Sequence, residues 1–297
     1  MLSAKLEAVG HAVSVPTLAR LLRKLNYSPH VNAKKIEASS NHPDREQQFD
    51  YIAVQRAIFT AAGLPILSVD TKKKELVGNF KNAGQVWARE PTAVNVHDYP
   101  HDALGRAVPY GVYDVTRNRG FVCIGTSGDT PAFAVDTISA WWRTEGEASF
   151  PEADHLLLLA DAGGSTSCQT RAWKERLQVQ ISDRFGLTVT VCHYPTGCSK
   201  WNPIEHRLFS QISCNWAGVP LRTWDTVIAC IRGTQTATGL LVQAVFNPCD
   251  YPTGQKVSDG EMAALHIEHH PICPTWNYTI RPRTPIPTSR ELRELIL

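Results

Sequence analysis

The chain has 297 residues, of which 43% are apolar, 20% charged and 8% aromatic. This composition excludes a disordered chain and is enough for one large domain with a small appendage. Purely apolar runs such as Leu156–Ala160 are only five residues long, which excludes a membrane-spanning helix. The formal net charge of +2 neither requires nor excludes a nucleic-acid partner, so the distribution of charge matters more.

The chain has eight cysteines but no C-x-x-C pair. Its N-terminus reaches the charged residues Lys5 and Glu7 too early for the apolar region of a secretory signal peptide. We therefore expect reduced thiols in a soluble protein of the cytoplasm.

The first 36 residues have the outline of a helix-turn-helix. One apolar stripe predicts a helix after an N-cap at Ser14 and a first-turn proline at Pro16, and a shorter helix over Leu2–Val9 is broken at Gly10. The stripe consists of Leu18, Leu21, Leu22 and Leu25. Six basic residues against one acidic residue give this segment a net charge of +5, and Arg20, Arg23 and Lys24 are its candidate DNA contacts. A plain antiparallel helix pair would show the same leucine pattern, so both interpretations stay open.

Beyond a polar linker over Glu37–Glu46, strands and helices alternate. The pattern predicts an antiparallel hairpin followed by β-α-β crossovers, hence an α/β fold with a mixed sheet and helices on both faces. The expected strands are 65–69, 108–115, 120–125, 156–160 and 187–192, and the expected helices are 48–62, 131–142, 171–185 and one beginning at 202–203.

Three acidic residues stand at points where an α/β sheet usually carries function. Asp70 and Asp161 each follow an apolar strand directly, and Glu205 begins the helix after Asn202-Pro203. Carboxylates converging there would supply oxygen ligands for a pair of Mg²⁺ ions. Each also has a simpler explanation: Asp161 as a turn residue, Asp70 as an ion-pair partner of Lys72–Lys74, and Glu205 as part of a capping box with Asn202.

The sequence around these acids favours the first explanation. The strings Ile66–Gly78, Leu159–Ser165 and His193–Arg207 closely resemble insertion-sequence transposases of the ISAzo-thirteen type, which have a ribonuclease-H-like DDE catalytic domain. The resemblance extends from Leu18 to Arg283 and includes the string Trp276–Ile280. It implies a five-stranded ribonuclease-H-like sheet and a catalytic, metal-binding triad of Asp70, Asp161 and Glu205, spaced 91 and 44 residues apart.

The same resemblance implies Mg²⁺ or Mn²⁺ as cofactor, transposon ends and target DNA as partners, a homo-oligomer, no membrane, and a cytoplasmic, nucleoid-associated location. The implied chemistry is DNA cleavage followed by strand transfer. A ribonuclease-H-like nuclease without strand transfer and a non-catalytic DNA-binding remnant of a transposon are the alternatives.

We expect four regions: a partial helix-turn-helix (1–36), a linker and helix (37–62), the catalytic core (63–220) and a C-terminal helical and strand extension (221–297). Similar transposases carry a longer helix-turn-helix, so we expect an N-terminally shortened chain that binds its DNA ends weakly. The candidate phosphate contacts are Lys200 and, placed on one face of an alternating strand, Lys72 and Lys74. An ordinary solvated lysine surface is the alternative explanation for Lys72 and Lys74, and both explanations stay open.

Three further motifs have structural rather than chemical explanations. His266, His269, His270 and Cys273 have spacings that could suit zinc, but Pro271 and the missing cysteine pair favour a histidine-rich loop. Trp141-Trp142 is expected to pack a helix on the sheet rather than stack on bases. His206 is turned about 100° away from Glu205 on a helix, which argues against a metal ligand.

Overall fold

The computed structural model describes residues 6–27 and 43–284, and the chain divides into two compact units, 1–40 and 41–297. In the first unit, helix α2 (Val15–Lys24) begins as predicted, because the Ser14 hydroxyl accepts a hydrogen bond from the Thr17 amide. A helical turn at 6–8 ends at Gly10, and the start of the helix expected over 2–9 lies outside the described residues. No α2 residue is buried: in the described part of the chain Leu18 and Leu22 of the leucine stripe are partly exposed, and Leu21 and Leu25 are exposed.

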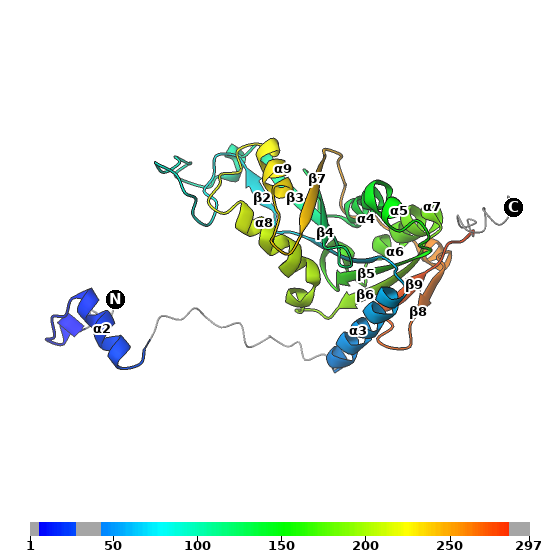
Figure 1. The fold of residues 1–297 in the computed structure, drawn as a ribbon, viewed down its shortest axis with the longest axis horizontal. Helices are drawn as coiled ribbons and strands as arrows, with labels where there is room; N and C mark the ends of the chain where they lie inside the picture. Colours follow the sequence, from blue (N-terminus) through cyan, green and yellow to red (C-terminus); the bar gives the residue numbers. More distant parts are fainter. Residues whose placement is uncertain (1–5, 28–42, 285–297) are drawn as a thin grey trace. The chain divides into compact units, whose positions relative to one another are not determined.

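The second unit is built on a mixed sheet of nine strands within residues 43–284 (Figure 1). Its order is β7-β4-β3-β1-β5-β6-β9-β8, and β2 pairs with β3. The strands are β1 (Ile66–Thr71), β2 (Glu75–Val77), β3 (Gly105–Asp114), β4 (Arg119–Gly125), β5 (His155–Asp161), β6 (Thr188–Tyr194), β7 (Leu241–Asn247), β8 (Ile267–His269) and β9 (Asn277–Ile280).

The predicted mixed sheet is confirmed, and it is larger than expected. The five predicted strands form its centre, with β1, β3 and β4 antiparallel and β1, β5 and β6 parallel. Four further strands join this centre: β2, β8 and β9 have only three or four residues each, whereas β7 has seven. Of these, β7, β8 and β9 come from the expected extension at 221–297. The central strands also run further than predicted, so Asp70 and Asp161 lie inside strands rather than after them.

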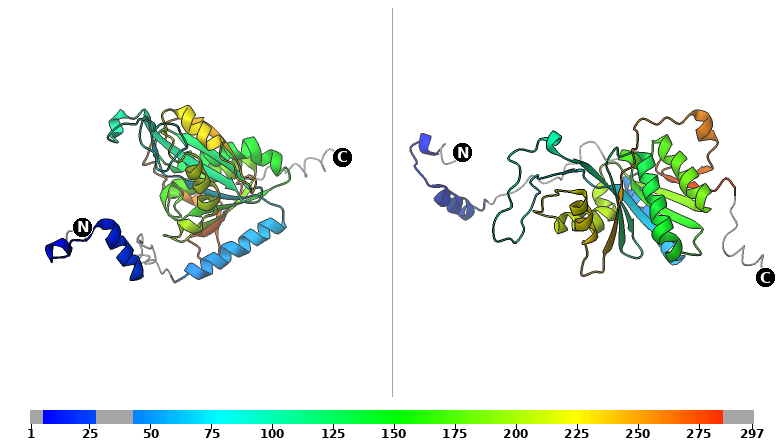
Figure 2. Two further views of the ribbon diagram at one scale, coloured as in Figure 1. Left: turned by 60° about the vertical axis from the view of Figure 1, so that its left-hand side comes forward. Right: turned by 90° about the horizontal axis from the view of Figure 1, so that it is seen from above.

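Helices cover both faces of the sheet (Figure 2). One face carries α3 (Arg45–Ala61), the helix that runs through a π-helical turn (Glu205–Phe209) into α8 (Ser210–Asn215), and α9 (Trp224–Arg232). The other face carries α4 (Pro131–Trp141) and α6 (Arg171–Leu177), which continue through π-helical turns into α5 (Glu147–Ser149) and α7 (Asp183–Phe185). A short helix, α10 (Asp259–Ala263), lies near α6. None of the described helices is both long and apolar enough to cross a membrane.

The linker expected over 37–46 is partly wrong. Arg45 and Glu46 already belong to α3, and residues 37–42 lie outside the described residues. The linker was predicted from Ser39, Ser40, Asn41 and Pro43, and all four precede the helix in the sequence.

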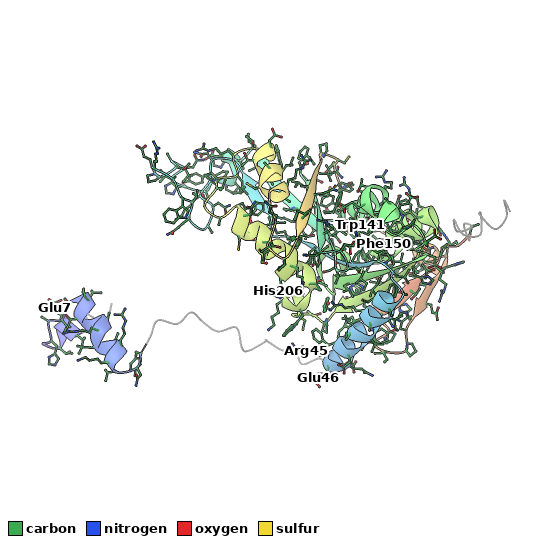
Figure 3. All side chains as sticks on the ribbon, viewed as in Figure 1. Glu7, Arg45, Glu46, Trp141, Phe150 and His206 are labelled. Carbon is green, nitrogen blue, oxygen red and sulfur yellow. The ribbon has the colours of Figure 1, made fainter. Side chains whose placement is uncertain are left out.

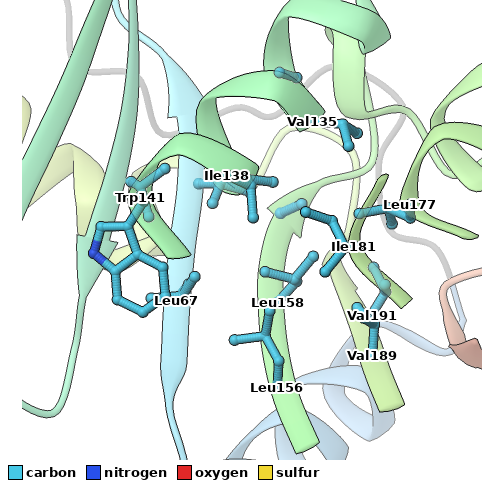
Figure 4. Packing of buried hydrophobic residues seen from close by; sticks show 14 of the residues in the cluster. Leu67, Val135, Ile138, Trp141, Leu156, Leu158, Leu177, Ile181, Val189 and Val191 are labelled. Carbon is cyan, nitrogen blue, oxygen red and sulfur yellow. The ribbon is translucent and has the colours of Figure 1, made fainter. Parts of the chain in front are cut away.

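The main core lies between the sheet and α4 and α6 (Figure 4). Ile138 and Trp141 of α4 and Leu177 of α6 point toward strand residues such as Leu67, Leu158 and Val191. Trp141 is fully buried and Trp142 nearly so, which agrees with the predicted packing role.

Two glycines let the helix after β6 lie close to the sheet on the face that also carries α3 and α9. A Cβ on Gly111 of β3 would lie 2.6 Å from a Phe209 ring carbon and 2.8 Å from Ile204 Cδ1. One on Gly120 of β4 would lie 2.5 Å from Leu208 Cδ1. The missing side chains therefore let the helix that carries Glu205 pack directly on the sheet beside β1.

Candidate active site

The register of the central strands places Asp70 and Asp161 at the same level. Ile66 pairs with Leu157 and Ser68 with Leu159 in parallel strands, an offset of 91 residues. Asp70 and Asp161 have the same offset, so they continue this register as neighbours. Alternation along each strand puts both on the face where Ile66, Leu157 and Leu159 contact α3.

Glu205 belongs to the helix after β6, which brings it to the ends of β1 and β5 where Asp70 and Asp161 lie. The start of that helix is fixed by Ser68 of β1, whose hydroxyl accepts a hydrogen bond from the Ile204 amide at 2.9 Å and donates one to the Asn202 side-chain oxygen. The Asn202 Nδ2 group donates to Asp161 Oδ1 at 3.1 Å and to the Val69 carbonyl at 3.4 Å. Asn202 is therefore not a side-chain cap for the helix, and it joins β1, β5 and the helix that carries Glu205.

The electrostatics of the three acids show that they lie close together. Burial, the charge of Asp161 and the charge and hydrogen bonding of Glu205 raise the pKa of Asp70 to about 8, although the Thr71 amide opposes this by donating at 2.7 Å. Burial and the charge of Glu205 raise the pKa of Asp161 to about 6, against the hydrogen bond from Asn202. The structure thus brings together all three acids that the sequence singled out.

The three carboxylates have the donor chemistry of a divalent metal site. The three side chains offer only carboxylate oxygens, the ligands that Mg²⁺ and Mn²⁺ prefer. A cation between them would offset both the burial and the mutual repulsion that raise the two pKa values. In the described parts of the chain, however, no group of three His, Cys, Asp or Glu residues is already arranged to hold a metal ion. The donor set fits such an ion, and side-chain adjustment would have to complete the site.

A buried polar network of Trp173, Tyr278 and His193 holds the backbone carbonyl of Asp161. The Asp161 carbonyl can only accept, so His193 Nδ1 carries the proton and donates to it at 2.9 Å. In the neutral ring Nε2 is then an acceptor, to which the Tyr278 hydroxyl donates at 3.1 Å, while that hydroxyl accepts from the Trp173 indole at 2.9 Å. Burial lowers the pKa of His193 to about 4, which keeps the ring neutral as this network requires.

The basic residues expected to contact DNA lie in different settings. The predicted placement of Lys72 and Lys74 on a strand is wrong, because β1 ends at Thr71 and residues 72–74 are not in a strand. The Lys72 side chain is buried, with Nζ 4.7 Å from the Trp216 ring centroid and 3.9 Å from Glu75 Oε1. Burial lowers the pKa of Lys72, and the charges of Glu75 and Glu205 oppose this shift. The remaining candidates are all exposed: Lys74, Lys200, and Arg20, Arg23 and Lys24 of the first unit.

The histidine-rich segment near the C-terminus makes structural hydrogen bonds. His270 bonds through Nδ1 to the Tyr51 hydroxyl at 2.6 Å and through Nε2 to Thr279 Oγ1 at 2.8 Å. His269 Nδ1 bonds to the Pro274 carbonyl at 2.6 Å. These partners differ for each ring, which favours the loop interpretation of His266, His269, His270 and Cys273. His206 is exposed, and its Nε2 contacts the Lys200 carbonyl.

Sequence reasoning missed the residues that position the acids. Ser68 lies two residues before Asp70 and so on the same face of β1, a polar residue in an otherwise apolar run, which is the one signal that could have identified it. Asn202 and His193 gave no local signal, because their partners are 41 and 32 residues or more away in the chain.

Comparison with known proteins gives one family and several solved structures. The family model described as "Rhodopirellula transposase DDE domain" matches residues 1–282. The Mos1 transposase paired-end complex with left transposon end is similar, with 14% identity and a TM-score of 0.45 over 76% of this chain and 62% of that one. The Mos1 strand transfer complex gives 15% identity and a TM-score of 0.46 over the same shares.

The chain thus spans about 62% of the length of these Mos1 chains. No match was found among curated proteins. The family match covers nearly the whole chain, including both central strands and the helix that carry the three acids, and this protein therefore belongs to the DDE transposase family of the Rhodopirellula type.

Proposed function

We propose that this protein is an insertion-sequence transposase that cleaves DNA and joins the freed end to a target, with Asp70, Asp161 and Glu205 as its catalytic acids. The observation that carries the proposal is that these three carboxylates lie close together at the ends of the central strands β1 and β5. The strand register and the hydrogen bonds of Asn202 and Ser68 hold them there. The proposed partners are transposon ends and target DNA, which implies action in the cytoplasm at the nucleoid.

The two steps are phosphoryl transfers without a covalent protein intermediate. Water attacks a phosphodiester in line, the bond to the 3′ oxygen breaks, and a 3′-hydroxyl and a 5′-phosphate are released. The 3′-hydroxyl then attacks a phosphodiester of the target and displaces its 3′ oxygen. When bound, two Mg²⁺ or Mn²⁺ ions would lower the pKa of the attacking group and stabilise the leaving oxygen.

The chain's own residues supply position and charge. Asp70, Asp161 and Glu205 would hold the ions, and the hydrogen bond from Asn202 fixes which oxygen of Asp161 is turned toward the helix. The exposed ammonium groups of Lys74 and Lys200 can neutralise phosphates of a bound DNA strand. Most of the rate enhancement would come from this orientation and electrostatic stabilisation.

The test uses duplex oligonucleotides that carry the ends of the element and a labelled target. Cleavage and a joined product in Mg²⁺ or Mn²⁺, both absent in EDTA, are expected. Cleavage without any joined product would favour the nuclease alternative, and binding without cleavage under all metal conditions would favour the non-catalytic remnant.

A further inference from the structure

An exposed aromatic surface adjoins the three acids and is not used by the proposed chemistry. We define the aromatic platform as Phe49 and Trp201 with the cations Arg45 and Lys200. The two rings meet edge to face with centroids 6.1 Å apart, and Trp201 is 52% exposed. A pocket of about 290 Å³ lies at the N-terminal end of α3 and is lined by Arg45, Glu46, Phe49 and Trp201. Figure 3 labels Arg45 and Glu46 at this end of the helix.

The platform is tied to the acid site through two separate contacts. Trp201 directly precedes Asn202, which donates to Asp161 Oδ1 at 3.1 Å. On the other side, the Phe49 ring lies 6.0 Å from the ring of Tyr194, the residue paired with Asp161 across β5 and β6. These contacts place the platform beside the strand of Asp161 and the start of the helix that carries Glu205, within reach of a DNA strand whose phosphate lies at the acids.

The charges on the platform complement such a strand. Lys200 Nζ lies 5.2 Å from the Trp201 ring centroid, and the Arg45 guanidinium carbon lies 5.8 Å from the Phe49 ring centroid. Each ring face thus has a cation beside it, the combination that single-stranded DNA sites use to stack bases and hold phosphates.

The size of the pocket argues for one flat ring. A volume of about 290 Å³ lies at the lower end of the roughly 300–1,000 Å³ typical of ligand pockets. Paired bases in a duplex keep their faces covered by neighbours, so only an unpaired base can present its face to Trp201. We infer that the aromatic platform binds an unpaired nucleobase of the DNA strand that passes the three acids, an inference that rests on the proposed function.

The test measures binding without cleavage. Full-length protein in EDTA is titrated with a duplex whose end carries a short single-stranded overhang, with 2-aminopurine as its first unpaired base. Stacking on Trp201 should quench the 2-aminopurine fluorescence. The Trp201→Ala variant should lose the quenching and bind the overhang roughly 5- to 150-fold more weakly, the range for losing one base–aromatic contact.

Matched variants separate stacking from general effects. Trp201→Phe should restore most of the quenching. Trp87→Ala removes another exposed tryptophan, from the loop after β2, and should leave both quenching and affinity unchanged. Phe49→Leu keeps apolar volume and removes the second ring, so an intermediate loss is expected.

Three results would overturn the inference. Trp201→Ala could quench and bind as wild type does, it could weaken a blunt duplex as much as the overhang, or it could dissociate a homo-oligomer in sedimentation, which would assign the platform to a second copy of the chain. Because the assay contains no metal, it stays informative if the wild-type protein proves unable to cleave DNA. That separate failure would instead refute the proposed function.

Discussion

Asn202 shows how one side chain can organise the candidate active site. Its amide bonds to Asp161, the Val69 carbonyl and the Ser68 hydroxyl, all in a buried setting. We predict that Asn202→Ala lowers the free energy of unfolding by about 1–3 kcal/mol, because it leaves buried polar groups unpaired. Urea unfolding measures this loss, and DNA cleavage by the folded variant should also slow.

A double-mutant cycle checks whether the loss comes from that pairing. Ser68→Ala combined with Asn202→Ala should cost less than the sum of the two single changes, since the double variant removes both ends of one hydrogen bond. Strict additivity would show that the two side chains act independently.

His193 makes a prediction about acid stability. Its pKa of about 4 in the folded chain is below the usual value of 6.5, so the unfolded chain binds more protons between these values. Stability from this group is therefore complete above pH 6.5 and falls as the pH is lowered toward 4. The contribution of His193 to stability is expected to fall by about 2 kcal/mol between pH 7 and pH 5, from the free-energy equivalent of each pKa unit. The raised pKa values of Asp70 and Asp161 act in the opposite direction over the same interval, because these carboxyls bind more protons in the folded chain. The His193 contribution is therefore measured as the difference between the wild type and a variant that lacks the imidazole.

The His193→Gln variant provides the control for this pH dependence, because glutamine does not titrate. In urea unfolding at pH 7 and pH 5, the change to the lower pH should be less favourable for the wild type than for the variant, by about 2 kcal/mol in the free energy of unfolding. If the stability of both proteins changes by the same amount, His193 is not the group responsible.

At the scale of elements, the contact between the Glu205 helix and the sheet depends on Gly111. A methyl group there would meet Phe209 and Ile204 at 2.6 and 2.8 Å. We predict that Gly111→Ala destabilises the fold by about 1–3 kcal/mol through overpacking and moves the helix away from Asp70, which would reduce cleavage. Gly260→Ala, whose Cβ would meet nothing closer than 4.0 Å, is the matched control and should unfold like the wild type in thermal denaturation. Equal stability of the two variants would contradict this packing account.

The elements that the sequence predicted best are those whose signal is local. The apolar runs before Asp70 and Asp161 are strands because every side chain in them is buried, and Ser14 and Thr130 cap their helices with their own side chains. Strands β2, β7 and β9 were missed because their partners β3, β4 and β6 lie far away in the chain. Strand β8 pairs with the nearby β9, but its three residues are too few to show a strand pattern in the sequence. Lys72 was misplaced for a related reason: strand alternation was extended past Thr71, where the strand ends.

At the scale of the whole molecule, the basic helix α2 and the acid site lie in different compact units. Arg20, Arg23 and Lys24 are exposed, so they can act as non-specific phosphate contacts. Replacing all three with glutamine should reduce the slope of log affinity against log salt by roughly 2 to 3. The measurement is DNA binding by fluorescence anisotropy at several salt concentrations. An unchanged slope would show that α2 does not contact DNA.

The central claim is that Asp70, Asp161 and Glu205 act as one catalytic unit, and single-turnover cleavage of the element's ends tests it most directly. Asp70→Asn, Asp161→Asn and Glu205→Gln should each reduce the rate by orders of magnitude, since stabilising the transition-state charge is worth several kcal/mol. Combining Asp70→Asn with Asp161→Asn should cost no more than either change alone. Without metal, Asp70→Asn should unfold at a temperature no lower than wild type, because it removes a buried, repelled carboxylate. A folded single variant that cleaves at nearly the wild-type rate would contradict the account.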